Sequence, residues 1–397
     1  MLIPDDLRIL RAAFEALNRD IRFVGGWVRA YMLGEAPKDI DLCTDASIEE
    51  MKEIAEACDV VLDLYPTGEE HGTMTFRLDS GLYEITCLRQ ETAHDGRRAD
   101  CVFGQDWDAD LARRDLTINA MAMDFDGRLY DPHGGAVDLK AGRVRFVGDP
   151  VDRMREDYLR ILRWLRFHAR YSKGPLDFDA RNAAEDLRDG LGPIKAVRTK
   201  IGYTVSRERV WDEMKKIIAG PRSAYILFQM VRMRLDEPLG FDGIVIGDRY
   251  NAVVRETADP IVRLVALFED TRDIEALATD WKWSREERSR AIFLSKCLLA
   301  EDVDVLSLVL MGVCDKDAAE DICILREDAD LLAYVRRWTP PEFPVKGQDL
   351  LDLGMKPGPQ MGVHLASLRR LFADHRGGVT KEQLLATLRL EIDLCPS

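Results

Sequence analysis

The hydrophobic residues of this chain change their spacing near residue 145. Residues 73–79 alternate apolar and polar side chains, which is the period of a strand with one buried face. A second run of this kind, residues 80–88, follows directly, so the pair predicts a β-hairpin. Further apolar runs predict three more strands, at residues 21–26, 38–44 and 116–124. We therefore expect the first part to be an α/β domain with a mixed, mostly antiparallel sheet.

The remaining patterns are helical. Residues 1–17 place acids and arginines among apolar positions, as in an amphipathic helix and unlike a signal peptide. Residues 31–37 and 47–58 also have helical character. After about residue 150, long helical stretches are interrupted at glycine and proline. Because 397 residues exceed what one hydrophobic core usually supports, we expect at least two domains and an all-helical remainder.

The composition narrows the class of protein. The chain is 46% hydrophobic and 32% charged, with a mean hydropathy of −0.21, as in soluble globular proteins. No apolar run approaches the roughly 20 residues of a membrane helix, so we expect no membrane partner. Eight scattered cysteines without a CxxC pair exclude a zinc ribbon and favour free thiols in a reducing cytoplasm. Six histidines without i+3 or i+4 spacing exclude the usual histidine metal motifs.

Charge is distributed unevenly along the chain. The net charge of −15 argues against general attraction to nucleic acid. Residues 143–170, however, hold eight arginines against four acids, whereas residues 301–330 hold ten acids against two bases. A basic stretch on an acidic protein suits localised phosphate binding. Ordinary patchiness of charge explains the same counts, and composition alone favours that explanation.

A glycine pair follows the first predicted strand. Gly25 and Gly26 stand between a strand and a helix, where backbone amides and the helix N-terminus can approach a phosphate closely. Arg29 lies one turn inside that helix. Glycines occur in many strand-to-helix turns that bind nothing, so this motif alone is a weak indication.

Two aspartates follow in the next predicted strand. Asp39 and Asp41 are two residues apart, so both carboxylates point to one face of the strand. Such close acids repel each other unless a cation lies between them, an arrangement that suits Mg²⁺-dependent phosphoryl chemistry. A solvated strand explains an isolated pair better, but the glycine turn before it favours the metal. Glu84 adds another ligand if its strand neighbours that of Asp41, and is otherwise an ordinary exposed glutamate.

Arginines mark two further segments. Arg113 and Arg114 can neutralise a triphosphate, while Asp115 or Asn119 can bind ribose hydroxyls; a salt bridge at a helix end is the alternative. Three more arginines recur every third residue along an otherwise apolar helix: Arg160, Arg163 and Arg166. Arginines on a buried helix need anionic partners, which are either internal acids or a triphosphate.

Taken together and in order, six segments resemble the class II CCA-adding tRNA nucleotidyltransferases, relatives of the bacterial poly(A) polymerases. The segments are GGWVRA, KDIDLCTDA, LYEITCLR, LARRDLTINAMA, EDYLRILRWLRF and SRERVWDEMKKI. They cover roughly residues 20–220 in the order of the family, which makes the match specific although no single motif is. Residues 345–362, VKGQDLLDLGMKPGPQMG, resemble a tail segment of the bacterial enzymes.

The resemblance implies a role for each matching residue. The catalytic Mg²⁺ ligands would be Asp39 and Asp41, with Glu84 as a further candidate. The incoming nucleotide would be bound by Gly26, Arg29, Arg114, Asp115 and Asn119. The base-selecting EDxxR motif is matched by Glu156, Asp157 and Arg160, and the nucleotide site would continue with Arg163 and Arg166. The ERxxxE motif, which would buttress the selecting helix, is matched by Glu208, Arg209 and Glu213.

The resemblance also implies an architecture and an activity. The family has a curved shape with a nucleotidyltransferase head, here 1–145, a helical neck with the base-selecting helix, 146–220, and a helical body and tail that bind tRNA, 221–397. The implied activity is template-independent addition of C, C and A to tRNA 3′ ends from CTP and ATP, with Mg²⁺ as cofactor and pyrophosphate as product. We expect a cytoplasmic protein and no DNA partner.

Other functions remain open from the sequence. A poly(A) polymerase and a partial enzyme that adds only CC or only A share the same motifs. A tRNA-binding protein without chemistry is a further alternative, against which the intact Asp39 and Asp41 count. The family commonly has aspartate where this chain has Ala30, which puts one supporting contact in doubt.

The EDxxR residues predict how bases are selected. Cytosine and adenine each present an amine donor beside an unprotonated ring nitrogen, so a carboxylate and a guanidinium can recognise both. Asp157 and Arg160, expected one helical turn apart, offer this pair. Uracil and guanine present the reverse pattern and would leave polar groups unpaired. The alternative is that the two side chains form a surface salt bridge with each other.

Overall fold

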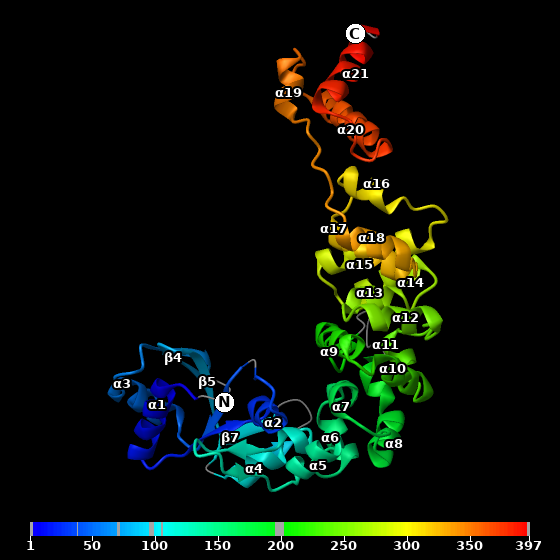
Figure 1. Cartoon of the computed structure of the whole chain (residues 1–397). Coiled ribbons are helices and arrows are strands. Elements are labelled where there is room, and N and C mark those ends of the chain that lie inside the picture. Colours follow the sequence, from blue (N-terminus) through cyan, green and yellow to red (C-terminus); the bar gives the residue numbers. More distant parts are fainter. Residues whose placement is uncertain are drawn as a thin grey trace. The chain divides into compact units, whose positions relative to one another are not determined.

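The computed structural model describes residues 3–37, 39–69, 72–94, 99–104, 106–194 and 202–394. It divides into two compact units, Met1–Leu239 and Gly240–Ser397 (Figure 1). All strands of the described residues belong to the first unit, and the second unit is helical. This division is coarser than the three predicted domains, whose limits stay a prediction.

A seven-stranded sheet forms the first part of the chain, in the order β3-β4-β5-β2-β1-β8-β9. Its strands are β1 (Ile21–Val24), β2 (Asp41–Thr44), β3 (Asp63–Gly68), β4 (Thr73–Leu78), β5 (Gly81–Cys87), β8 (Ala122–Met123) and β9 (Leu129–Tyr130). Neighbouring strands are antiparallel except β2 and β5, which are parallel. The predicted mixed, mostly antiparallel sheet is therefore confirmed.

The predicted hairpin is strands β4 and β5. Met74, Phe76 and Leu78 of β4 are buried and Arg77 is exposed, as the alternation predicts, but Thr75, predicted on the face of Arg77, is buried as well. Two short antiparallel pairs do not follow from the apolar pattern: β6 (Arg89–His94) with β7 (Ala99–Phe103), and β10 (Pro193–Ile194) with β11 (Gly202–Tyr203).

The prediction of one strand over residues 116–124 is wrong for most of that segment. A 3₁₀ helix spans Thr117–Asn119, and β8 begins only at Ala122. The Asp115 carboxylate accepts hydrogen bonds from the next backbone N–H and from the Asn119 amide, each at 2.9 Å. Aspartate side chains that bond nearby groups in this way compete with an extended strand.

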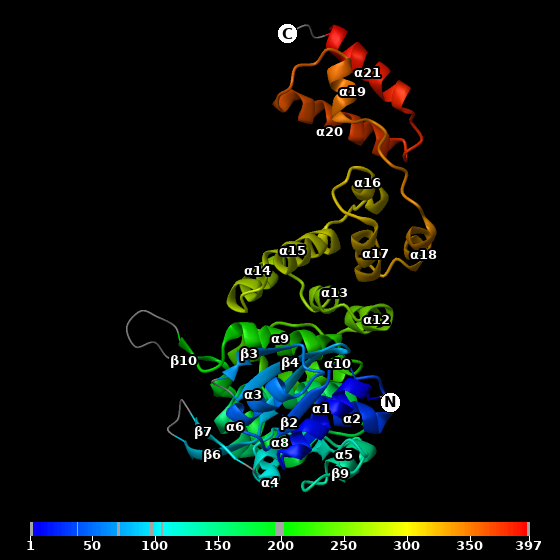
Figure 2. The same cartoon turned by 90° about the vertical axis from the view of Figure 1, so that its left-hand side faces the viewer.

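Some helices pack on this sheet and the others continue the first unit beyond it (Figure 2). They are α1 (Asp5–Ala16), α2 (Gly26–Leu33), α3 (Ile48–Ala57), α4 (Trp107–Ala112), α5 (Gly135–Ala141), α6 (Pro150–Glu156), α7 (Leu159–Tyr171), α8 (Phe178–Asp186), α9 (Arg207–Ala219), α10 (Ser223–Arg232) and α11 (Asp236–Leu239). Helix α1 is amphipathic as predicted, and its buried Phe14 packs against Phe76 of β4 with ring centroids 6.2 Å apart. Helix α3 covers β3 and β4.

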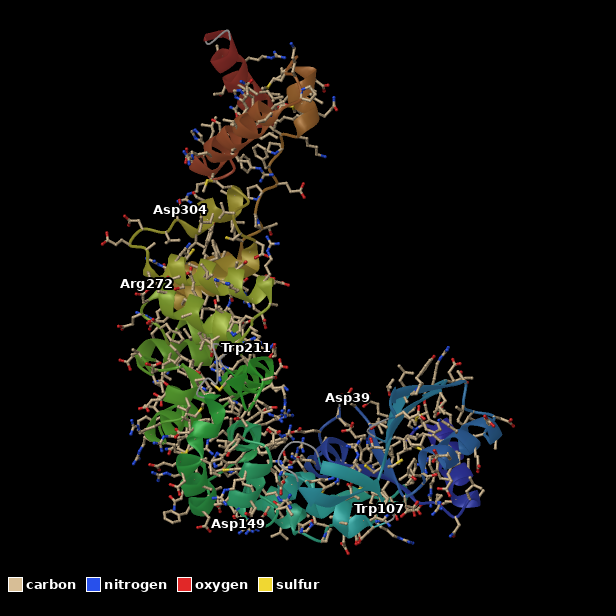
Figure 3. All side chains as sticks on the ribbon, turned by 180° about the vertical axis from the view of Figure 1, so that it is seen from behind. Asp39, Trp107, Asp149, Trp211, Arg272 and Asp304 are labelled. Atoms are coloured by element: carbon tan, nitrogen blue, oxygen red, sulfur yellow. The ribbon has the colours of Figure 1, made fainter. Side chains whose placement is uncertain are left out.

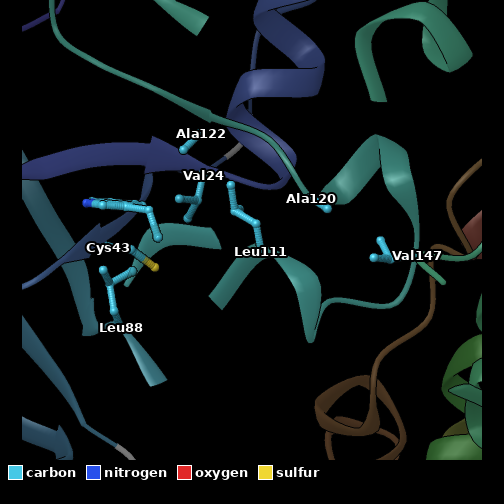
Figure 4. Packing of buried hydrophobic residues seen from close by; sticks show 8 residues of the cluster. Val24, Cys43, Leu88, Leu111, Ala120, Ala122 and Val147 are labelled. Atoms are coloured by element: carbon cyan, nitrogen blue, oxygen red, sulfur yellow. The ribbon is translucent and has the colours of Figure 1, made fainter. Parts of the chain in front are cut away.

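One hydrophobic cluster joins the strands that carry the predicted motifs. Figure 4 shows its members from β1, β2, α4 and the segments beside them: Val24, Cys43, Leu88, Trp107, Leu111, Ala120, Ala122 and Val147. Burial of this cluster fixes the glycine turn after β1 relative to the start of β2. The cysteines whose side chains are described are free thiols, as predicted: Cys43, Cys58, Cys87, Cys297, Cys314 and Cys323.

The second unit is built from helices α12 (Asp248–Glu256), α13 (Pro260–Val265), α14 (Thr271–Asp280), α15 (Arg285–Leu299), α16 (Val305–Leu310), α17 (Lys316–Leu325), α18 (Ala329–Arg337), α19 (Gly347–Asp352), α20 (Pro359–Asp374) and α21 (Lys381–Leu394). Part of the acidic stretch 301–330 has a structural explanation, because three of its aspartates are side-chain N-caps of helices: Asp304, Asp315 and Asp328. Among the described residues, no helix is long and apolar enough to cross a membrane.

Candidate active site

The first unit contains a cavity of about 500 Å³. Its wall comes from the β1–α2 turn, the start of β2, the segment after α4, the α6–α7 junction and helices α7 and α9. The lining residues are Gly25, Gly26, Arg29, Asp41, Arg113, Arg114, Asp115, Asn119, Asp157, Arg160, Arg163, Phe167 and Arg209. The sequence motifs, up to 184 residues apart (209 − 25), thus meet around one space.

Glycines let the backbone approach the charged groups of this wall. Gly25 has φ 60°, a conformation that favours glycine, and a Cβ there would lie 3.3 Å from Arg114 Nη1. A Cβ at Gly26 would lie 3.7 Å from Asp41 Oδ2 and 3.8 Å from Arg29 Nη2. Helix α2 begins at Gly26, as the strand-to-helix turn predicts.

The acids of the site occupy two neighbouring parallel strands. Asp41 is the first residue of β2 and pairs in register with Glu84 of β5, so the condition under which Glu84 was expected to add a ligand is met. Asp39 was expected on the same strand; it lies instead in the loop before β2 (Figure 3), and Lys38, the start of the predicted run, lies outside the described residues. The strand begins only where backbone pairing with Glu84 begins.

Electrostatic repulsion is concentrated at Asp41. Desolvation by the surrounding protein and the negative charges of Asp39 and Glu84 raise the pKa of Asp41, and together they outweigh the cations Arg114 and Arg29. Carboxylate oxygens are ligands that Mg²⁺ prefers, and a cation here would relieve the repulsion. In the described part of the chain, no group of three or more His, Cys, Asp or Glu is arranged to hold a metal. The carboxylate of Asp41 suits an ion that takes most of its ligands from substrate phosphates and water.

A buried carboxylate holds two arginines of the cavity wall. Asp110 is fully buried on α4; its Oδ1 accepts from Arg113 Nε at 3.0 Å, and its Oδ2 accepts from Arg114 Nη2 at 3.1 Å. Burial alone would raise the pKa of Asp110, but Arg114 and Arg113 outweigh it and hold the pKa below its usual value. One negative charge between two guanidinium groups leaves a net positive wall that suits an anion.

A second network connects the head segments to helix α7. Asp115 Oδ2 accepts from Arg163 Nε at 2.7 Å, while Asn119 donates to Asp115 Oδ1 and accepts from Arg29 Nη1. Burial opposes ionisation of Asp115, but Arg163 and Asn119 hold its pKa below the ordinary value. The carboxylate therefore stays charged and fixes Arg163 in the cavity.

The predicted base-selecting residues lie at the junction between α6 and α7. Helix α6 ends at Glu156, and Asp157 has extended backbone angles, so the expectation that Asp157 lies on one helix with Arg160 is wrong. The alternative of a mutual salt bridge is also wrong. Asp157 Oδ2 pairs with Arg209 Nη2 of α9 at 2.7 Å, and Arg160 Nη1 pairs with Glu156.

Most predicted site residues reach the cavity, and four do not line it: Asp39, Glu84, Glu156 and Arg166. Arg166 instead donates to Glu213 Oε2 of α9 at 2.5 Å, which joins the EDxxR-bearing and ERxxxE-bearing segments. Gly25 and Arg113, which the sequence analysis placed beside a phosphate, also line the cavity, as do Phe167, which had no predicted role, and Arg209, which was expected only to buttress the selecting helix. Phe167 could have been found, since it lies four residues after Arg163 on the same helix face. Ala30, where the family commonly has aspartate, is nearly buried at 9% exposure.

Comparison with known proteins agrees with this site. Residues 21–145 match the family model described as the poly A polymerase head domain. The chain is 34% identical over 402 residues to a protein of Danio rerio named CCA tRNA nucleotidyltransferase 1, mitochondrial, covering 98% of this chain and 91% of the relative. It is 32% identical to the CCA-adding enzyme of Lactobacillus helveticus, covering 92% of this chain and 90% of that one.

Solved structures show the same fold. The CCA-adding enzyme of Bacillus stearothermophilus in complex with CTP matches with a TM-score of 0.71 at 22% identity, covering 99% of this chain and all of that chain. Near-complete coverage at this identity supports the α/β head followed by helices, and the sequence relatives supply the family. The chain belongs to the family of CCA-adding tRNA nucleotidyltransferases.

Proposed function

We propose that this protein adds C, C and A, one nucleotide at a time and without a nucleic-acid template, to the 3′ end of tRNA, using CTP and ATP. The observation that carries the proposal is the joint lining of one cavity by the strand carboxylate Asp41, a cluster of arginines and the EDxxR residues Asp157 and Arg160. One bound nucleoside triphosphate could therefore contact both the carboxylate proposed for catalysis and the residues proposed to recognise the base. The names of the near full-length relatives agree with this substrate.

Asp39 and Asp41 are the proposed ligands of Mg²⁺, with Glu84 beside them. Burial is the largest cause of the raised pKa of Asp41, and the nearby charges of Asp39 and Glu84 add to it; a bound cation would offset this repulsion. Such an ion supplies neutralisation of phosphate charge and a lower pKa for the attacking hydroxyl. Removal of either aspartate would leave the other as the only aspartate ligand of the cation.

The other groups of the wall bind and orient the triphosphate. The backbone at Gly25–Gly26 and the N-terminus of α2 favour phosphate oxygens, while Arg113 and Arg114 supply positive charge from their shared support on Asp110. Asn119 is the proposed contact for the ribose, beside Asp115. The RNA 3′-oxygen would then form a bond to the α-phosphorus as the bond to pyrophosphate breaks, with alignment and charge stabilisation as the main contributions of the protein.

Asp157 and Arg160 are the proposed reading pair for cytosine and adenine. Both side chains can make further hydrogen bonds beside their ion pairs, because each carboxylate oxygen accepts more than one hydrogen bond and a guanidinium has five donors. Arg209 and Glu156 restrain the two side chains through these ion pairs. Restrained donors and acceptors select bases better than mobile ones, because less side-chain entropy is lost on binding.

The second unit is the proposed holder of tRNA, through phosphate contacts. The Gly- and Pro-rich segment Lys346–Gly362 spans α19 and the start of α20, and the N-cap of α20, Gly358, has no side-chain cap, so the start of this helix suits phosphate. Deletion of residues 340–397 should weaken tRNA binding, and binding by the full chain should fall steeply with salt. A folded truncation with undiminished affinity would contradict the role of this segment. The cytoplasmic location stays a prediction, because the vertebrate relatives are named as mitochondrial proteins.

The deciding experiment supplies tRNA that ends before CCA, with each nucleoside triphosphate alone and in combination. Two C followed by one A is the expected product. Long A tracts would identify a poly(A) polymerase, and C or A alone would identify a partial enzyme. Binding of tRNA without any incorporation would point to a protein that has lost the chemistry.

A further inference from the structure

Helix α7 carries two stacked aromatic rings beside the cavity. Phe167 and Tyr171 lie one turn apart, with ring centroids 5.9 Å apart and planes inclined by 21°. The guanidinium carbon of Arg29, from helix α2, lies 4.9 Å from the centroid of each ring. Both distances are within the range of cation–π attraction, so the two rings together form one cradle for one cation.

Hydrogen bonds alone leave the Arg29 guanidinium weakly fixed. Its Nη1 donates to Asn119 Oδ1, but its buried Nε has no hydrogen-bond partner among the described residues. The third nitrogen, Nη2, lies near the point where Gly26 would carry a Cβ, as does Asp41 Oδ2. Nη2 of Arg29 thus lies at the catalytic end of the cavity, near Asp41, and the aromatic contacts are the remaining restraint on the plane of the guanidinium.

We propose that Phe167 and Tyr171 are positioning residues for Arg29, and that this cradle sets how tightly every incoming nucleotide binds, whatever its base. The inference rests on the proposed function. Tyr171 does not line the cavity, so its effect passes through Arg29. Phe167 does line the cavity, so it can also contact the substrate directly. A substitution of Tyr171 therefore tests the effect on Arg29 alone.

The position of the cradle on α7 gives the proposal a distinct signature. Helix α7 also carries Arg160 and Arg163, which face the same cavity. Loss of a base-reading group changes the preference among nucleotides. Loss of the cradle weakens the contact of Arg29 with the ribose triphosphate, which CTP and ATP share. The KM values for both nucleotides should therefore rise by the same factor.

The test replaces Tyr171 by leucine, which keeps apolar volume but removes the ring. KM for CTP and for ATP should each rise about threefold to thirtyfold, with little change in kcat and an unchanged preference over UTP and GTP. The affinity for CTP without tRNA, measured by calorimetry, should fall by the same factor. Tyr171→Phe, which keeps the ring, should behave like wild type.

Two controls separate positioning from general damage. Arg170 lies 5.0 Å from the same Tyr171 ring but is mostly exposed and pairs with Glu35 at 3.1 Å, so Arg170→Ala should leave KM unchanged. In an Arg29→Ala background, Tyr171→Leu should have no further effect on CTP affinity, because the cation it positions is absent. Additive losses, an unchanged KM or an altered base preference would overturn the inference. A wild type that binds CTP but adds nothing to tRNA would instead refute the proposed function and leave the binding test valid.

Discussion

The two units of the molecule use their carboxylates in different ways. All buried carboxylates of the described residues belong to the first unit: Asp110, Asp115, Asp138 and Glu213. Each of them pairs with arginine. Helix capping by aspartate is common to both units, as with Asp149 for α6 and Asp304 for α16 (Figure 3), so the two units differ in the buried, arginine-paired carboxylates.

The buried carboxylates orient the arginines of a site, whereas the capping aspartates stabilise helices. A buried ion pair contributes little net stability, because desolvation offsets much of the attraction. Asp110 and Asp115 nevertheless hold Arg113, Arg114 and Arg163, all of which line the cavity. Burial here keeps the arginines in fixed positions before a ligand arrives, which suits an active site.

The largest expected effect is at the strand carboxylate. Asp41→Ala should abolish nucleotide addition, because it removes charge at the position proposed for the cation. Assays of CTP incorporation into tRNA should show a loss of more than about a thousandfold, which corresponds to several kcal/mol of transition-state stabilisation. Circular dichroism and tRNA binding should change little. Residual turnover above this level would contradict the role of Asp41.

The contrast between the units is tested by removing one aspartate from each. Asp110→Ala leaves two arginines without their buried partner and should lower the free energy of unfolding by about 3 kcal/mol. Asp304→Ala removes an exposed N-cap and an exposed ion pair with Arg376 and should cost about 1 kcal/mol. Urea denaturation measures both. Only Asp110→Ala should also raise KM for nucleotides, and equal costs would show that burial does not distinguish the two positions.

Base selection should depend on the α6–α7 junction. Asp157→Ala or Arg160→Ala should reduce discrimination against UTP and GTP by about tenfold to a hundredfold, since each unpaired polar group costs about 1–3 kcal/mol. Single-nucleotide incorporation with each triphosphate measures this, and metal-dependent chemistry should persist. If both variants reject UTP and GTP as strongly as wild type, these residues do not read the base.

A buried histidine should make the first unit sensitive to mild acid. Burial lowers the pKa of His168 to about 4, from an ordinary value of 6.5. Below pH 6.5 the unfolded chain therefore takes up a proton that the folded chain does not, so stability falls as the pH falls toward 4. Between pH 7 and pH 5 the loss should be about 2 kcal/mol. Denaturation of His168→Gln should lose this part of the pH dependence; an unchanged pH profile would contradict the assignment.

The sequence by itself determined the local elements and most members of the site. Alternation of apolar and polar residues predicted the β4–β5 hairpin, and the glycine pair predicted the turn before α2. Both features depend only on residues that are close together in the sequence. From the sequence, Glu84 could share a cation with Asp41 only if their strands were neighbours. The parallel pairing of β2 with β5 meets this condition.

Tertiary structure decided which charged groups face one another. The contact of Arg29 with Asn119 spans 90 residues, and that of Arg209 with Asp157 spans 52. No local periodicity encodes such pairs, because each depends on how separate elements pack. The same reason explains why Asp157 and Arg160, three residues apart in one motif, have different partners. It also explains why the aromatic cradle forms only when the fold brings the Arg29 guanidinium of α2 to the rings of α7.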